Sequence, residues 1–268
     1  MPTDSVLTEV RNDGIATITF NRPRVHNAID EAVIAEFKAG LGQVAADPRA
    51  RVVVIAGEGE SFCAGADLNW MKRSAAYTEQ QNYQEAVDFA ELLHLLHAMP
   101  KPTIARVHGP AYGGGVGIVA ACDIAIATRS ASFVFSEVRL GLIPAMISPY
   151  AIAAIGERCA RRYMLTAERI DAALALSIGL LHEICDAAEL DERVRQVAAN
   201  LLRGGPDSIA ACKRLIDRVA HMPIDAAARE YTARAIAAVR ASREGKEGVG
   251  AFLEKRKPNW MPVEGSGS

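Results

Sequence analysis

The alternation of strand-like and helix-like segments in the first half of the chain is the feature that most restricts its fold. Branched residues in short runs predict strands, and apolar residues spaced three and four apart predict the helices between them. Strand, helix, strand repeats join parallel strands through crossover connections. We therefore expect an α/β fold around a mainly parallel sheet. The strands are predicted at 6–10, 15–20, 52–56, 103–107, 124–127 and 133–135, and the helices at 30–46, 79–99 and from the glycines 113–115 to about 121.

Beyond Pro144 the strand-like segments almost vanish. Helices are predicted at 145–155, 157–165, 171–178, 189–202, 206–220 and 224–243, and a strand at 181–184. The part that follows Asp207 is rich in alanine and arginine, so it cannot extend the sheet and must pack on the core or on a neighbouring subunit. We divide the chain into a core with the site (1–206), a helical C-terminal region (207–264) and a disordered tail (265–268).

The composition excludes several classes of function. Half of the 268 residues are apolar, which is enough for one substantial core. The 30 basic and 32 acidic residues are interspersed and leave a net charge of −2, so no single-sign field would attract nucleic acid. The apolar runs are shorter than the roughly 20 residues of a membrane span, and Asp4 and Glu9 interrupt any secretory segment. We expect a cytoplasmic protein that binds neither nucleic acid nor a membrane.

Motifs for metals, nucleoside triphosphates and serine nucleophiles are missing from the sequence. The five cysteines have no CxxC spacing, and no carboxylate is spaced to complete a metal site with His94 and His97. The chain lacks the GxSxG motif of serine hydrolases and the GxxxxGK[ST] loop that binds nucleoside triphosphates. We therefore expect no metal site.

Two small-residue segments predict a site that polarises a carbonyl group. Gly113-Gly114-Gly115 follows a predicted strand and opens a helix, where unobstructed amides meet the positive end of the helix dipole. FCAGAD, at 62–67, ends another strand in residues small enough for a ligand to approach the backbone. The amides of Ala66 and Gly114 could then bind one oxygen together as an oxyanion hole.

A dinucleotide site is the competing interpretation of the glycine-rich segment. Gly115 to Ala120 fits the GxGxxG/A pattern, and it follows a strand and opens a helix as that pattern requires. However, the acid that binds the ribose should end the next strand, and Thr128-Arg129 stands there instead. We favour the oxyanion hole.

Four segments in the same order as in a known family extend this interpretation to nearly the whole chain. The sequence resembles the enoyl-CoA hydratase/isomerase (crotonase) superfamily. This resemblance implies an α/β fold built as a crotonase-like ββα spiral, a helical C-terminal region that forms trimers, and often hexamers of two trimers. It also implies an acyl-CoA thioester substrate, with no metal or redox cofactor, since coenzyme A is part of the substrate. The segments are NRPRVHNA (21–28), FCAGADL (62–68), GPAYGGGVGIVAACDIAIA (109–127) and FSEVRLGLIP (135–144).

The resemblance also implies roles for single residues. Ala66 and Gly114 would be the oxyanion-hole donors, and Glu137 in FSEVRLG matches a catalytic glutamate of the hydratases. Phe252 and Lys255 would reach the CoA site of a neighbouring subunit. The adenine and pantetheine would follow Ala28, Ala64, Asp67 and Leu68. Given an acyl-CoA substrate, the basic residue Arg24 in the first loop is a candidate contact for the CoA phosphates, and the alternative is that it belongs to a solvated basic turn.

The sequence departs from the hydratases at one position. These enzymes usually carry a second glutamate two positions after GGG, where this chain has Gly117. A glycine can neither donate a proton nor orient a water through a side chain. Glu137 would then act with water and the oxyanion hole, helped by a substrate carboxylate or another residue, while Gly117 leaves room for a bulkier acyl group.

The resemblance favours this interpretation over two others. GADLNWM, GGGVGIVAACDIAIA and SEVRLGLIPAMISPY resemble hydratases of branched, carboxylated enoyl-CoAs such as 3-methylglutaconyl-CoA, in leucine or acyclic-terpene breakdown. One alternative is a Δ3,Δ2-enoyl-CoA isomerase, in which a single carboxylate moves a proton between C2 and C4. The other is a pseudoenzyme or partner subunit that binds acyl-CoA without hydrating it.

Overall fold

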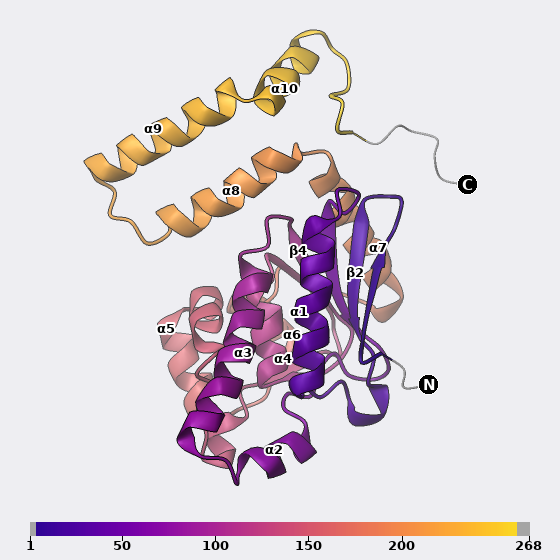
Figure 1. The fold of residues 1–268 in the computed structure, drawn as a ribbon, viewed down its shortest axis with the longest axis vertical. Helices are drawn as coiled ribbons and strands as arrows, with labels where there is room; N and C mark the ends of the chain where they lie inside the picture. Colours follow the sequence, from indigo (N-terminus) through magenta and orange to yellow (C-terminus); the bar gives the residue numbers. More distant parts are fainter. Residues whose placement is uncertain (1–3, 262–268) are drawn as a thin grey trace.

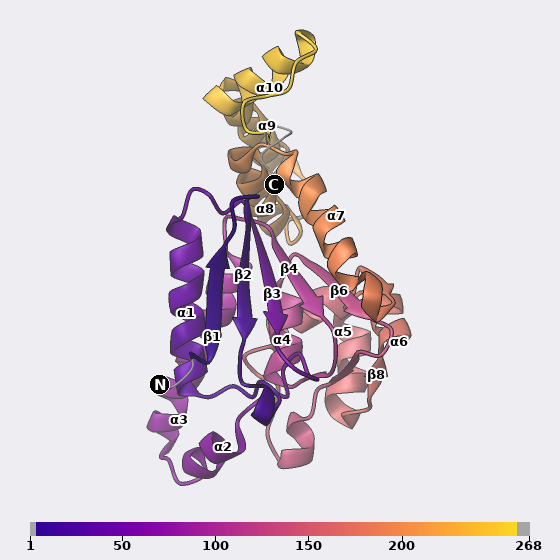
Figure 2. The ribbon, with the colours of Figure 1, turned by 90° about the vertical axis from the view of Figure 1, so that its right-hand side faces the viewer.

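The computed structural model describes residues 4–261 and is built on a six-stranded sheet in the order β1-β2-β3-β4-β6-β9 (Figures 1 and 2). β1 and β2 form an antiparallel hairpin around Gly14, whose φ of +88° suits glycine, and the other neighbours pair in parallel. The predicted α/β class and mainly parallel sheet are therefore confirmed. The strands are β1 (Val6–Val10), β2 (Ile15–Phe20), β3 (Val52–Gly57), β4 (Thr103–Val107), β6 (Ile124–Thr128) and β9 (Glu183–Cys185).

Helices cover both faces of this sheet. On one face lie α1 (Glu31–Ala46), α3 (Glu79–His97) and α4 (Gly114–Ala121), which share the larger apolar core with the strands. Asp30 caps α1 by accepting a hydrogen bond from the amide of Val33 at 2.9 Å. On the other face α7 (Leu190–Leu202) buries its apolar stripe against β3, β4 and β6 (Figure 2). The small-residue loops follow the carboxyl ends of strands that are held by helices on both faces.

A second sheet of three short strands was not predicted as a sheet. Its strands are β5 (Ala111–Tyr112), β7 (Ser132–Val134) and β8 (Ile170–Asp171), with β5 and β7 parallel and β7 and β8 antiparallel. β5 runs directly into Gly113, whose amide donates to the carbonyl of Val134 at 2.9 Å. This small sheet therefore holds the glycine-rich loop in place.

The second half of the chain is helical, as predicted. Its helices are α5 (Ser148–Thr166), α6 (Ala172–Ser177), α8 (Pro206–Val219), α9 (Ala226–Ala241) and α10 (Arg243–Leu253), with short 3₁₀ helices at 137–140 and 187–189. Two helices were predicted where α5 lies, and Gly156, with φ +73°, divides α5 into two pieces at that point. The helix predicted at 224–243 ends earlier, because Ser242 leaves the helical region and caps α10.

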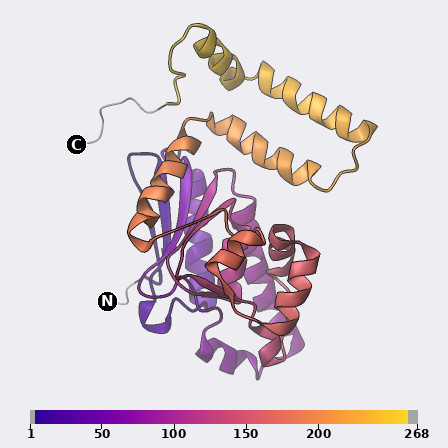
Figure 3. The ribbon, with the colours of Figure 1, turned by 180° about the vertical axis from the view of Figure 1, so that it is seen from behind.

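The helices α8, α9 and α10 lie beyond one end of the sheet, opposite the end near α2 (Leu68–Ser74) (Figures 1 and 3). Neither α8 nor α9 contains a buried residue. Lys213 attaches α8 to the core by an ion pair with Asp123 at 2.6 Å. The predicted boundary at 206/207 coincides with the start of α8 but stays a prediction, and the tail predicted at 265–268 lies outside the described residues.

Two further features can be stated for residues 4–261. No helix there is both long and apolar enough to cross a membrane. The same residues contain no group of three or more His, Cys, Asp and Glu side chains arranged to hold a metal ion.

Candidate active site

A pocket of about 380 Å³ lies where the two small-residue loops meet α2, α3 and the segment before α5. It contains Ala66, Gly114 and Glu137, which come from three distant parts of the sequence. Most of its wall is apolar. The remaining lining residues include Ile29, Ala64, Leu68, Trp70, Met71, Phe89, Leu140, Leu142, Ile143, Met146 and Ile147. Such a pocket, apolar with a few convergent polar groups, is typical of a small-molecule site.

The two loops contact each other through backbone atoms. A Cβ atom on Gly65 would lie 3.0 Å from the carbonyl oxygen of Tyr112, and one on Gly115 would lie 2.6 Å from the carbonyl oxygen of Cys63. The amide of Tyr112 also donates to the carbonyl of Cys63 at 2.9 Å. Side chains at the two glycines would therefore force the loops apart, so both glycines are required for this approach.

The amides of Ala66 and Gly114 are both placed for a ligand. Ile29 forms a parallel bridge with Ala66 by donating to the carbonyl of Gly65 at 2.7 Å and accepting from the amide of Asp67 at 2.8 Å. The amide of Ala66 between them consequently points to the other side. Gly114 is the first residue of α4, so its amide has no acceptor within the helix. Both residues line the pocket, as the oxyanion-hole prediction requires.

Glu137 is the titratable group best suited to proton transfer in this pocket. Its Oε1 lies 3.1 Å from the position that a Cβ atom on Gly113 would take, next to the first turn of α4. Its Oε2 is buried and has no hydrogen-bond partner among the described residues. Burial raises the pKa of the Glu137 carboxyl above its ordinary value, because the charged form is desolvated. A carboxyl whose pKa is raised holds a proton more readily than an exposed carboxyl does, and this suits a group that exchanges a proton with a substrate.

The interpretation that Gly117 leaves room for a bulkier acyl group is wrong. A Cβ atom on Gly117 would lie 2.1 Å from Cγ2 and 2.7 Å from Cβ of Ile147, so this isoleucine already fills the space. Ile147 is 2% exposed and lines the pocket. The pocket wall at this place is therefore apolar and closed.

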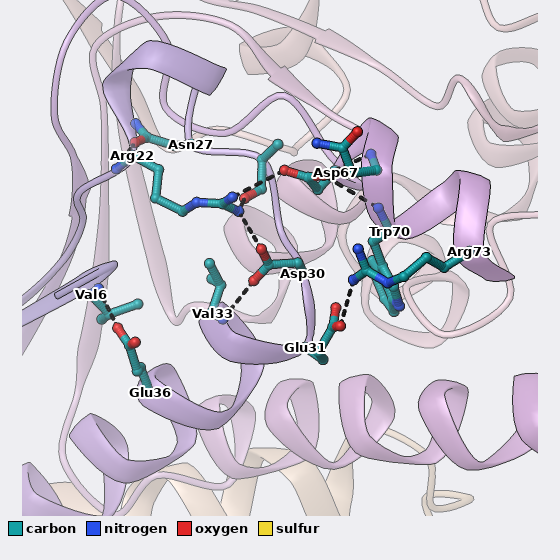
Figure 4. A network of polar contacts seen from close by, with 12 residues as sticks. Val6, Arg22, Asn27, Asp30, Glu31, Val33, Glu36, Asp67, Trp70 and Arg73 are labelled. Atoms are coloured by element: carbon teal, nitrogen blue, oxygen red, sulfur yellow. Dashed lines mark hydrogen bonds and ion pairs between the residues drawn. The ribbon is translucent and has the colours of Figure 1, made fainter. Parts of the chain in front are cut away.

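Asp67 has a structural role that the sequence analysis did not predict (Figure 4). Its buried carboxylate caps α2 by accepting from the amides of Asn69 at 2.8 Å and Trp70 at 3.3 Å. It also pairs with Arg22 at 3.1 Å, and Arg22 pairs with Asp30 at 2.8 Å. Asp67 does not line the pocket, so we assign its side chain to holding α2 behind Ala66.

The other predicted contacts of the CoA moiety fall into two groups. Ala64 and Leu68 line the pocket, and Leu68 is 73% exposed at its mouth. Ala28 is buried outside the lining, and its carbonyl accepts from Arg22 at 2.7 Å. Arg24 is exposed in the 3₁₀ turn at 23–25 and does not line the pocket.

Phe252 and Lys255 are not brought to the pocket of their own chain. Phe252 is 82% exposed on α10, and Lys255 follows that helix with φ +56°. α10 lies at the end of the molecule opposite α2, which forms one wall of the pocket (Figures 1 and 2). Any contact of these residues with a CoA site would thus require a second copy of the chain.

Several lining residues were not proposed from the sequence. Phe89 is one of the buried apolar residues of α3. Trp70 and Met71 lie on α2, which has seven residues and was not predicted as a helix. The role of Ile147 could not be predicted from its neighbours in the sequence, because it contacts Gly117, thirty positions away.

The glycine-rich segment does not have the form of a dinucleotide loop. Gly115 and Gly117 lie inside α4 and are buried against Cys63 and Ile147. The amide of Gly117 also donates to the carbonyl of Gly113 at 3.3 Å, so it is not available to a phosphate group. This agrees with the preference for an oxyanion hole at the preceding residue, Gly114.

Comparisons with known proteins agree with the fold. A sequence profile of the enoyl-CoA hydratase/isomerase family matches residues 10–262. Crotonyl-CoA hydratase of Syntrophomonas wolfei is 33% identical over 257 residues, which are 94% of this chain and 96% of that protein. (E)-Benzylidenesuccinyl-CoA hydratase of Thauera aromatica is 33% identical over 255 residues, 94% of this chain and 97% of that protein.

Solved structures show the same relationship. The crystal structure of an enoyl-CoA hydratase from Shewanella pealeana superposes with a TM-score of 0.93 at 41% identity and covers 96% of both chains. Pseudomonas aeruginosa AtuE superposes with a TM-score of 0.91 at 36% identity and covers 96% of this chain and 100% of that one. The predicted crotonase-like fold is confirmed. The chain belongs to the enoyl-CoA hydratase/isomerase family.

Proposed function

We propose that this chain is an enoyl-CoA hydratase that adds water reversibly across the 2,3 double bond of an enoyl-CoA thioester. The amides of Ala66 and Gly114 bind the thioester oxygen. Glu137 takes a proton from water as the water oxygen bonds to C3, and the same carboxyl then gives this proton to C2 of the enolate. In the reverse direction the same groups remove water from the 3-hydroxyacyl thioester.

The observation that carries this proposal is the environment of Glu137. One oxygen of its carboxyl is buried without a partner, and the carboxyl lies beside the first turn of α4 in the pocket that Ala66 and Gly114 also line. An orphaned buried oxygen costs stability unless a ligand uses it. Negative charge that develops on the thioester oxygen is stabilised by amides already fixed in place.

Replacement of Glu137 by glutamine tests the proposal. Glutamine keeps the shape but cannot exchange the proton, so the rate of hydration should fall by about 10²- to 10⁴-fold while acyl-CoA affinity is kept. Glu85→Gln is the matched control, because Glu85 is the other glutamate of the lining and lies on α3. Loss of enoyl thioester absorbance reports the rate. Full activity of Glu137→Gln would refute the assigned role.

A second candidate function is Δ3,Δ2-enoyl-CoA isomerisation. The observation that favours it is the apolar contact of Ile147 with Gly117, which leaves Glu137 without a second acidic side chain at that wall. One carboxylate is sufficient to move a proton between C2 and C4 through a bound enolate. Crotonyl-CoA, a 3-enoyl-CoA and 3-methylglutaconyl-CoA assayed side by side distinguish the two functions. Binding without any turnover would indicate an acyl-CoA-binding pseudoenzyme.

The proposal includes a branched, carboxylated acyl group such as that of 3-methylglutaconyl-CoA. Its support is the resemblance of the segments around Trp70, Gly117 and Glu137 and the name of the Thauera relative. The pocket lining contains no Lys, Arg or His, so within the described chain such a carboxylate would have to be received by uncharged donors of the lining, namely Ser74, Asn82, Ser136 and the buried indole Nε1 of Trp70. A preference for 3-methylcrotonyl-CoA over 3-methylglutaconyl-CoA would contradict this part.

We further propose that the protein acts as a homotrimer or as a hexamer of two trimers in the cytoplasm. The support is that α8 and α9 have no buried residues, although large apolar side chains such as Ile216, Ile236 and Phe252 are exposed on α8, α9 and α10. Apolar surface of this kind is typical of subunit contacts. Phe252 and Lys255 would then approach a neighbouring CoA site. Sedimentation velocity would reveal a monomer if the proposal is wrong.

A further inference from the structure

The close contact between Ile147 and Gly117 determines where one wall of the pocket stands. The 2.1 and 2.7 Å separations from a hypothetical Cβ atom concern the stem of the isoleucine, so a simple rotation of its far end cannot relieve them. Ile147 directly precedes α5, and its backbone carbonyl accepts from the amide of Ala151 at 3.0 Å. The side chain is thus held between α4 and the beginning of α5.

The first turn of α4 connects the wall at Ile147 to the part of the site that contains Glu137. The amide of Gly117 donates to the carbonyl of Gly113 at 3.3 Å, so the two residues lie one turn apart. Gly113 is contacted by the Glu137 carboxyl, Gly114 faces the ring of Phe89, and Gly117 faces Ile147. The side chains that face this turn are therefore, in order, a carboxyl, an aromatic ring and a branched aliphatic side chain.

We propose that Ile147 is the specificity-determining residue that sets the depth of the acyl pocket along α4. This inference rests on the proposed acyl-CoA function. An acyl group held at Ala66 and Gly114 meets Ile147 along α4, and additional carbons must turn toward the wall formed by Trp70, Met71 and Phe89. Glycine at 117 lets α5 approach closely enough to place Ile147 there.

Binding of unreactive saturated thioesters tests the inference without relying on hydration. In Ile147→Ala, we expect the affinity for isovaleryl-CoA or hexanoyl-CoA to rise relative to the affinity for butyryl-CoA. The ratio should change by about fourfold for each methylene that enters the new space, because a buried methylene contributes about 0.8 kcal/mol. Ile155→Ala is the matched control, because Ile155 is a buried isoleucine of α5 outside the lining. It should lower stability similarly but leave the affinity ratios unchanged. Isothermal titration calorimetry measures the ratios.

A rescue pair tests the contact itself. Gly117→Ala should weaken folding and butyryl-CoA binding. The double variant Gly117→Ala with Ile147→Gly should lose less stability than the sum of the losses of its two single variants, since only the Cα atom of residue 147, at 3.6 Å, would remain near the new methyl group. Unchanged affinity ratios in Ile147→Ala, or simply additive losses of stability in the double variant, would overturn the inference. If the unaltered protein binds no acyl-CoA at all, the proposed function itself fails, and this inference fails with it.

Discussion

The carboxylate of Asp67 both caps α2 and neutralises Arg22, and two substitutions separate these tasks (Figure 4). Asparagine is as good an N-cap as aspartate but carries no charge, so Asp67→Asn keeps the cap and loses the ion pair and hydrogen bond with Arg22. Arg22 keeps Asp30 at 2.8 Å and is about a quarter exposed, which reduces this loss. Alanine loses the cap as well.

The magnitudes follow from these contacts. Hydrogen bonds to charged groups contribute about 1.5–3 kcal/mol, and with Asp30 still in place we expect Asp67→Asn to lower the free energy of unfolding by about 1.5 kcal/mol. The lost cap adds about 1 kcal/mol in Asp67→Ala. Urea unfolding at constant m-value measures both. Because α2 begins directly after Ala66, acyl-CoA affinity should also fall more in Asp67→Ala than in Asp67→Asn.

The pH dependence provides the test that would refute this reasoning. Burial alone would raise the pKa of Asp67, but the amides of Asn69 and Trp70, together with Arg22, outweigh it and lower the pKa below its model-compound value of 3.8. The carboxylate therefore stabilises the fold above pH 3.8, and this stabilisation is lost as the pH falls further. The difference between the unaltered protein and Asp67→Asn should shrink below pH 3.8. A constant difference, or equal stability of the two variants, would contradict the argument.

Two further predictions concern Glu137 and Lys213. Folding raises the pKa of Glu137, so ionisation of this carboxyl lowers the stability of the fold as the pH rises from 4.5 to the folded pKa. Glu137→Gln should therefore be more stable than the unaltered protein at pH 8 and equally stable at pH 4. Thermal unfolding at both pH values checks this. Lys213→Met leaves Asp123 without its cation and should lower the free energy of unfolding by about 2 kcal/mol and speed hydrogen exchange in α8. The exposed Lys72→Met should change neither quantity, and an equal effect there would contradict the role of the pair.

Sequence periodicity was sufficient for the main sheet and its covering helices. Each of its strands has three or more residues, and the stripe of α1 at Val33, Phe37 and Leu41 is buried as predicted. The small sheet was missed because β5 and β8 have two residues each, too few to show alternation. α2 was missed because its helical start depends on the side chain of Asp67 rather than on an apolar stripe.

The candidate site was predictable where it depends on motifs and not where it depends on distant contacts. Ala66, Gly114 and Glu137 lie in segments that could be recognised, and all three line one pocket. The role of Asp67 depends on Arg22, 45 positions away, and the closed wall depends on Ile147. Neither partner can be identified from local spacing.

The backbone contact of the two small-residue loops, at Gly65 and Gly115, has a consequence for mutagenesis. The proposed donors are backbone amides, which remain when Ala66 or Gly114 is replaced by another residue with a backbone N–H, so an alanine scan would not detect the group that polarises the substrate. Only an amide-to-ester exchange at these residues removes the donors and leaves the walls intact. For the same reason, substitutions at wall positions such as Phe89 and Ile147 can change the acyl group that is accepted while the donors keep their place.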